Sequence, residues 1–141
     1  PWGRVKADVY MPCATQNEIG LEDAKRMIEE GTSKLLIEVA NMPTKAEAVE
    51  ELQKAGFMIA PSKAVNAGGV AVSALEMSQN AMKLSWTEEE VDEKLKKIMK
   101  NIFNNIDSAA KKYGMDGNLI AGANIAGFLK VAEAMLDEGI F

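Results

Sequence analysis

The sequence predicts an α/β fold: a parallel sheet of about three strands with crossover helices, followed by a C-terminal helical segment. Two observations predict it. In roughly the first 60 residues, short apolar runs alternate with helix-period stretches, an order typical of parallel strands joined by helices. Beyond that point the apolar residues recur only at helical spacing. We therefore expect one domain in which the sheet comes first and the helices follow.

The predicted strands are short and rich in Val, Ile, Leu and Met. They cover residues 7–11, 34–39 and 57–60, and each precedes a polar or glycine-containing turn. Helix-period stretches separate them at residues 21–30 and 45–55. The order is therefore strand, helix, strand, helix, strand.

The rest of the chain is predicted to be helical. Residues 70–84 are small and apolar on most sides, which indicates a buried helix. A long helix begins after Thr87, which forms a capping box with Glu90, and ends near Gly114. Its spacing predicts one buried stripe, made of Val91, Leu95, Ile98, Ile102 and Ile106. The last helix has small residues that allow close packing against a neighbour: Ala121, Gly122, Ala123, Ala126 and Gly127.

Composition indicates one globular domain. The chain has 141 residues, of which 48% are hydrophobic and 26% charged. No apolar run approaches the ~20 residues of a membrane span, so we expect a soluble protein without a membrane partner. The formal charge of -5 argues against a nucleic-acid partner, because phosphate binding needs clustered Lys and Arg.

Two residue types limit the chemistry. The chain has no histidine, so we expect no metal site and no Ser-His or Cys-His catalysis within it. The single cysteine, Cys13, cannot form an internal disulfide, which favours the cytoplasm. We expect Cys13 to be a small buried hydrophobic residue rather than a nucleophile.

Polar, amide-rich segments follow all three predicted strands: "PCATQNE", "VANMPT" and "APSKAVNAGG". In open α/β sheets the ligand lies beyond the carboxyl ends of the strands. Each of Asn17, Asn41 and Asn66 could instead bond its own backbone in a turn. Three asparagines at equivalent places in the topology favour a ligand site.

The third segment joins a predicted loop to a helix that we expect to begin near Val70. A carboxamide such as that of Asn66 offers a donor and an acceptor, which suits it to bind another carboxamide without adding charge. Gly68 and Gly69 would let the backbone approach a planar ring. The helix N-terminus and the Ser73 hydroxyl would favour an anion. Alternatively, Ser73 bonds a carbonyl one turn earlier.

Several long motifs carry a resemblance to a known family. "PCATQNE", "EVANMPT", "APSKAVNAGGVAVSALEMSQN", "LSWTEEEVD" and "NLIAGANIAGFLKVAEAM" resemble the carboxyl-terminal third of hexameric bacterial glutamate dehydrogenases, most closely the clostridial type. The resemblance covers the whole chain. It implies part of a Rossmann-like sheet, NAD or NADP as coenzyme, a homohexamer, and reversible oxidative deamination of L-glutamate to 2-oxoglutarate and ammonia.

The resemblance also implies roles for single residues. The positions matching Ala14, Thr15, Gln16 and Asn41 lie along the nicotinamide ribose, and the position matching Asn66 contacts the nicotinamide. Val70 and Ser73 match positions that line the pocket for the substrate side chain and its carboxylate. Ala74 stands where the family usually has glycine, which adds a methyl group beside this pocket, and Phe103 stands where a histidine is common.

The resemblance covers only part of the family's machinery. Its catalytic lysines and aspartate belong to an amino-terminal domain, and no G-x-G-x-x-G occurs in these 141 residues. We expect half of a coenzyme domain at about residues 1–69 and closing helices at about residues 70–141, cut from a longer protein because Pro1 is no initiator methionine. The chain alone should be inactive, and its preference for NAD or NADP is left open. The alternative function is a non-catalytic folding or assembly module that retains the scaffold.

Overall fold

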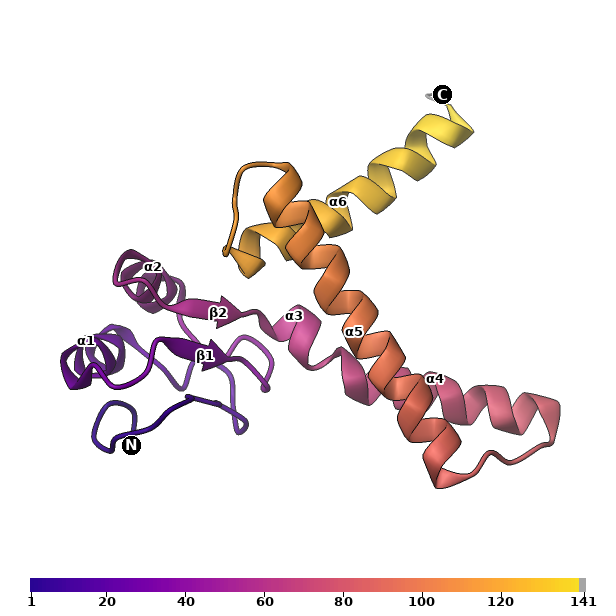
Figure 1. Cartoon of the computed structure of the whole chain (residues 1–141), viewed down its shortest axis with the longest axis horizontal. Coiled ribbons are helices and arrows are strands. Elements are labelled where there is room, and N and C mark those ends of the chain that lie inside the picture. Colours follow the sequence, from indigo (N-terminus) through magenta and orange to yellow (C-terminus); the bar gives the residue numbers. More distant parts are fainter. Residues whose placement is uncertain (140–141) are drawn as a thin grey trace.

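The computed structural model describes residues 1–139, and Figure 1 shows an α/β body followed by extended helices. The elements, in chain order, are α1 (Leu21–Glu30), β1 (Leu35–Ile37), α2 (Ala46–Lys54), β2 (Met58–Ala60), α3 (Ser62–Val65), α4 (Ala67–Met82), α5 (Glu88–Lys112) and α6 (Leu119–Glu138). The α/β architecture and the helical C-terminal segment confirm the predicted fold class. Both predicted crossover helices are present as α1 and α2.

The sheet is parallel, with Leu36 of β1 opposite Ile59 of β2. The predicted first strand is reduced to one parallel bridge, between Tyr10 and Leu36. Its two hydrogen bonds join Tyr10 N–H to Leu35 O at 3.0 Å and Ile37 N–H to Tyr10 O at 2.9 Å. Pro12 follows two residues later and has no N–H to continue the ladder. The prediction of a full strand over residues 7–11 was therefore wrong in extent, although its place beside β1 is correct.

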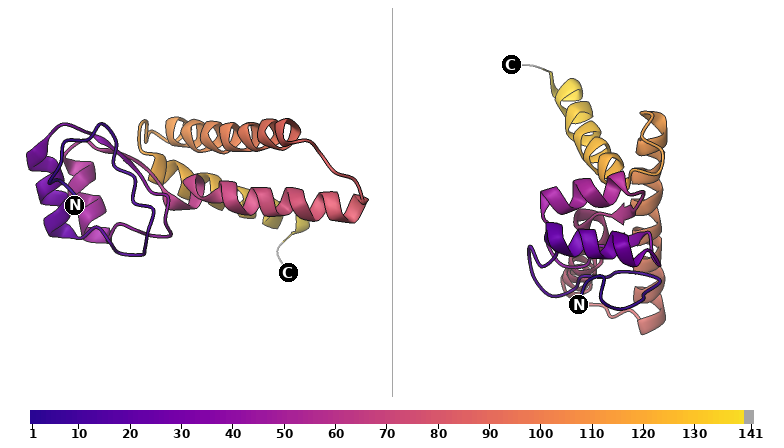
Figure 2. Two further views of the ribbon diagram at one scale, coloured as in Figure 1. Left: turned by 90° about the horizontal axis from the view of Figure 1, so that it is seen from below. Right: turned by 90° about the vertical axis from the view of Figure 1, so that its left-hand side faces the viewer.

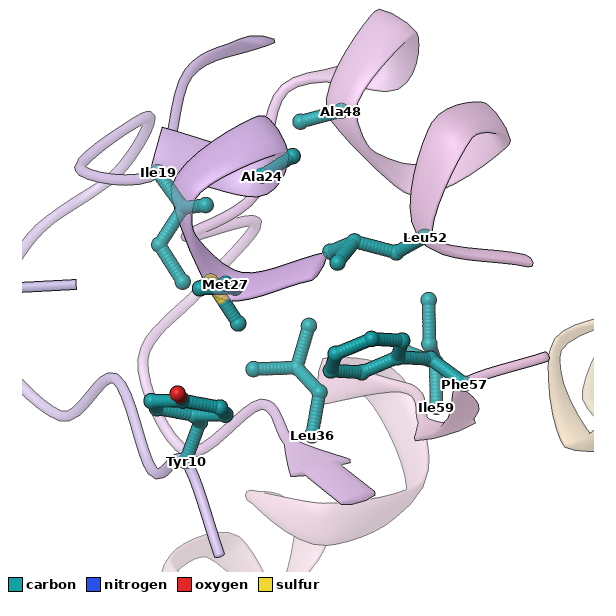
Figure 3. Close-up of a cluster of buried hydrophobic side chains, with 9 residues drawn as sticks. All are labelled: Tyr10, Ile19, Ala24, Met27, Leu36, Ala48, Leu52, Phe57 and Ile59. Atoms are coloured by element: carbon teal, nitrogen blue, oxygen red, sulfur yellow. The ribbon is translucent and has the colours of Figure 1, made fainter. Parts of the chain in front are cut away.

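The main core lies between the sheet and the pair α1 and α2. Figure 3 shows Leu36 and Ile59 of the two strands pointing toward side chains of these helices. The cluster consists of Tyr10, Ile19, Ala24, Met27, Leu36, Ala48, Leu52, Phe57 and Ile59, all of them buried. Side chains alternate between the faces of a strand, so the neighbours of Leu36 and Ile59 face the opposite side, toward α5 and α6. This core holds the carboxyl ends of the strands in place.

Helix α6 crosses α5 at a very close contact. A Cβ placed on Gly122 would lie 2.1 Å from the carbonyl oxygen of Ile106, so only glycine allows this approach. The prediction that small residues serve close packing is confirmed at this position. The capping box is confirmed as well, since Thr87 N–H donates to Glu90 Oε2 at 2.8 Å and Glu90 N–H donates to Thr87 Oγ1 at 3.2 Å.

Helix α4 differs from the prediction of a buried helix at residues 70–84. It has no buried residue, and Val70 and Met77 are 71% and 72% exposed. Figure 2 shows why: α4 runs beside α5 and away from the α/β body, so only one side of it is covered. For the same reason only Ile106 of the predicted α5 stripe is buried. The other four residues of the stripe are half-buried, so the described residues cover the apolar face of α5 only in part and that of α4 less.

Helix α6 is also mostly exposed beyond its crossing with α5. By length and composition it is apolar enough to cross a membrane, with a mean hydropathy of 1.5 and 11% of that stretch buried. The expectation that no apolar stretch approaches the length of a span was wrong for this helix. A core helix of a soluble protein passes the same test, so this helix is weak evidence for a membrane span.

Candidate functional site

The segments that follow the Tyr10 bridge and β1 meet the start of α4 around one pocket of about 680 Å³. Six of the seven residues proposed from the sequence line it. The lining consists of Cys13, Ala14, Thr15, Gln16, Val39, Ala40, Asn41, Asn66 and Val70. Cys13 is exposed, so the expectation that it is buried was wrong. Its segment lines the pocket beyond the strand ends and lies outside the core.

Backbone hydrogen bonds hold the first two segments side by side. The carbonyl of Pro12 accepts from Val39 N–H at 3.1 Å and from Ala40 N–H at 2.9 Å. Further along, Asn17 N–H donates to Met42 O at 3.0 Å, and Asn17 adopts a left-handed conformation with φ of 57°. Asn17 is thus a turn residue, which is the alternative given above for each of the three asparagines. It does not line the pocket.

The other two asparagines contact each other directly. Asn66 Nδ2 donates to Asn41 Oδ1 at 2.5 Å, which links the segment after β1 to the join between α3 and α4. Asn66 is the residue between these helices, with φ of -82° and ψ of 0°. The bond brings together two of the carboxamides that sequence analysis placed at this edge.

The buried carboxylate of Glu38 accepts a hydrogen bond from the start of α3. Glu38 is only 6% exposed, and its Oε2 accepts from Ser62 N–H at 3.0 Å, at the start of α3. The first N–H groups of a helix lack intrahelical partners, and a carboxylate satisfies one of them. Sequence analysis missed Glu38. Its one signal was an acidic residue at the end of an apolar strand.

The glycines lie in a helix, which corrects the predicted loop. Residues 62–65 form α3, and α4 begins at Ala67, so Gly68 and Gly69 belong to its first turn and Val70 does not start the helix. A Cβ on Gly68 would lie 3.5 Å from Met99 Sδ of α5, whereas one on Gly69 would contact nothing. Gly68 therefore faces α5, and only Gly69 leaves open space in front of its backbone.

Ser73 lies one turn further along α4 and does not line the pocket. Its hydroxyl donates to Gly69 O at 3.3 Å. This is the bond of the structural alternative, in which a helical serine satisfies a carbonyl one turn earlier. The side chain is exposed and remains accessible from outside the chain.

The pocket has uncharged walls, since none of the residues that line it is Asp, Glu, Lys or Arg. Amide and hydroxyl groups from Thr15, Gln16, Asn41 and Asn66 give it both donors and acceptors. A second cavity, of about 310 Å³ between the sheet and helices α5 and α6, has only apolar residues in its lining. The amide-lined pocket is therefore better suited than this apolar cavity to a neutral, polar, planar group.

The amide-lined pocket lies beyond the carboxyl ends of parallel strands, which is where open α/β sheets bind their ligands. Over residues 1–139 the chain matches the family model described as Glutamate/Leucine/Phenylalanine/Valine dehydrogenase. The chain belongs to this dehydrogenase family, which confirms the resemblance seen in the sequence.

Curated relatives define the similarity further. The chain is 55% identical to the NAD-specific glutamate dehydrogenase of Clostridium symbiosum, over 99% of this chain and 31% of that protein. It is also 55% identical to the NADP-specific glutamate dehydrogenase of Giardia intestinalis, over 94% of this chain and 29% of that protein. The chain thus spans about a third of the length of the curated relatives it matches.

Solved structures agree. A glutamate dehydrogenase structure matches with a TM-score of 0.92 at 55% identity, over 99% of this chain and 31% of that one. A structure of Plasmodium falciparum glutamate dehydrogenase 2 matches with a TM-score of 0.91 at 50% identity, over 99% of this chain and 30% of that one. The arrangement of the helices is thus shared with whole dehydrogenases.

Proposed function

We propose that this chain is the nicotinamide-facing part of an NAD(P)-dependent glutamate dehydrogenase, which converts L-glutamate reversibly to 2-oxoglutarate and ammonia. The observation that carries the proposal is the convergence of Asn41 and Asn66 on one uncharged pocket, in a chain 55% identical to glutamate dehydrogenases. Residues of about 1–69 would form the coenzyme half and about 70–141 the closing helices, of which residues 140 and 141 lie outside the described part.

The residues of the pocket fit a neutral carboxamide. Asn66 would bond the carboxamide of the nicotinamide, while Ala14, Thr15, Gln16 and Asn41 would lie along its ribose. NAD or NADP, when bound, would take the hydride from the substrate. The uncharged walls would add no fixed charge beside the ring, whose charge changes in the reaction. Relatives at equal identity include NAD-specific and NADP-specific enzymes, so overall similarity does not favour either coenzyme.

Substrate binding would involve the outer side of α4. Val70 lines the pocket and is 71% exposed, so it would contact the substrate side chain next to the ring. Ser73, one turn further, would rotate its hydroxyl from Gly69 O toward the substrate carboxylate. Both residues face outward, where a substrate domain would close over them.

The proposal extends to the assembly and its compartment. Exposed apolar faces on α4 and α6 support burial against further protein, as in a homohexamer. One structural neighbour, from Thermus thermophilus, is described as a hetero-hexameric glutamate dehydrogenase; at 24% identity and a TM-score of 0.87 it supports the fold alone. We place the enzyme in the cytoplasm, with no nucleic-acid or membrane partner.

A chimaeric dehydrogenase tests the proposal. In it, this chain replaces the matching segment of the Clostridium symbiosum relative. We expect the chimaera to form NADH or NADPH from glutamate and the 141-residue chain alone to form none. The resemblance implies that the general acid–base groups belong to an amino-terminal domain of the family, and such groups contribute about 10²–10⁴ in rate. A chimaera that folds and binds neither coenzyme would instead favour the non-catalytic folding module. Turnover of glutamate by the isolated chain would also contradict the proposal, in which the catalytic groups belong to another part of the enzyme.

A further inference from the structure

Two residues with a left-handed backbone come directly after two residues that line the pocket. Asn17 follows Gln16 and has a φ of 57°, and Met42 follows Asn41 and has a φ of 45°. Asparagine adopts this conformation at little cost, but in methionine it brings Cβ too close to the following carbonyl oxygen. The next residue, Pro43, also favours an extended backbone at Met42. The conformation of Met42 is therefore strained.

Hydrogen bonds and the core hold this conformation in place. Asn17 N–H donates to Met42 O at 3.0 Å, so the two left-handed residues are joined to each other. Ile19 N–H donates to Pro43 O at 3.0 Å, and both Ile19 and Pro43 are fully buried. Each segment thus lines the pocket at one residue and returns to the core within three residues. The left-handed residue lies in the turn between these two points.

Packing of the side chains does not account for the strain. Asn17 and Met42 are both exposed, and Met42 is 62% exposed. A strained backbone persists only where its surroundings determine it, and such residues gather at functional sites. The Met42 side chain lines a neighbouring cavity of about 320 Å³. A direct contact between that side chain and a ligand is therefore the competing explanation.

We propose that the left-handed backbone of Asn17 and Met42 holds Gln16 and Asn41 at the pocket, which makes Asn17 and Met42 positioning residues for the coenzyme. Because the core fixes Pro43, a change of φ at Met42 would move Asn41 relative to the rest of the pocket. The inference rests on the proposed function, since it takes the ligand to be a nicotinamide coenzyme.

The test compares two substitutions that differ in their tolerance of a positive φ. Glycine accepts it without strain, whereas β-branched valine does not. NAD, the coenzyme named for the Clostridium symbiosum relative, is titrated into the chimaeric dehydrogenase by calorimetry without glutamate. We expect Met42→Val to weaken NAD binding about fivefold, which corresponds to about 1 kcal/mol, the order of the cost of a left-handed L-residue. Met42→Gly should bind NAD like the unchanged chimaera.

Three results would overturn the positioning role. Equal losses of NAD affinity in Met42→Val and Met42→Gly would mean that the methionine side chain matters and its backbone does not. No loss in either variant would mean that the conformation of Met42 does not reach the pocket. An equal rise of the KM for glutamate in Met42→Val would indicate general damage. Asn41→Ala tests the proposed function separately, because unchanged NAD affinity in that variant would overturn the coenzyme site itself.

Lys83 provides a matched control. It is the one other non-glycine residue with a positive φ in residues 1–139, with φ of 55°, and it lies at the end of α4 and outside the pocket. Lys83→Val should lower the melting temperature and leave NAD affinity unchanged; a loss equal to that of Met42→Val would overturn the proposal. If Met42→Val does not fold, Asn17→Val and Asn17→Gly make the same comparison on the other segment, and equal NAD affinities there would overturn it too.

Discussion

At the scale of single residues, Ser73 and Asn66 allow the substrate and coenzyme roles to be separated. In the chimaeric dehydrogenase, Ser73→Ala should raise the KM for glutamate about ten- to hundredfold, because a charge-assisted hydrogen bond to a carboxylate contributes about 1.5–3 kcal/mol. Asn66→Ala should weaken binding of the coenzyme more than binding of glutamate. Initial-rate kinetics of both variants against both ligands provide the measurement.

The bond from Ser73 to Gly69 O supplies the competing expectation. If that bond is the only role of the hydroxyl, Ser73→Ala leaves the KM for glutamate nearly unchanged and stabilises α4 slightly. Equal losses for both ligands in both variants would mean that the join between α3 and α4 is structural and not a binding site.

At the scale of elements, the crossing of α5 and α6 depends on Gly122. Gly122→Ala places a methyl group 2.1 Å from Ile106 O, and backbone at that position cannot move without separating the helices. We expect the isolated chain to lose about 1–3 kcal/mol of unfolding free energy, the usual cost of overpacking. Urea unfolding followed by circular dichroism measures it.

Gly127 is a matched control in the same helix, since a Cβ there would meet nothing within 4 Å. Gly127→Ala should stabilise the chain by about 0.5–1 kcal/mol, because alanine favours a helix more than glycine. If both substitutions changed the unfolding free energy in the same direction, helix propensity rather than the contact between α5 and α6 would determine stability in α6.

At the scale of the whole molecule, apolar surface on α4 and α6 should cause the isolated chain to self-associate. The exposed side chains include Val70, Met77, Phe128, Val131, Met135 and Leu136, and an exposed apolar surface of this kind favours association. Light scattering at increasing concentration should give a mass above that of one chain. A constant monomer mass at high concentration would contradict this expectation.

The face of α6 can be tested directly. Phe128→Glu places a charge at a side chain that is 70% exposed and should reduce the association. Asn101→Glu adds the same charge on α5 and should not. If both variants associate like the unchanged chain, the contact lies elsewhere, for example at the free edge of the sheet beside Tyr10.

Sequence alone determined the features that depend on short-range pattern and on topology. The period of the apolar residues predicted α1 and α2 to within one residue at every end, and the spacing of Thr87 and Glu90 predicted the start of α5. The rule that parallel strands end at one edge predicted that the segments of Gln16, Asn41 and Asn66 lie together. These features need only local chain geometry and the order of the elements.

The tertiary structure alone decided which faces are covered and which groups meet. Sequence could not show that Gly68 faces α5, that α4 is exposed, or that Glu38 supports α3. It also could not pair Asn41 with Asn66. The physical reason is that periodicity describes one element at a time. Burial, close approach and hydrogen bonds between distant segments depend on how those elements dock against one another.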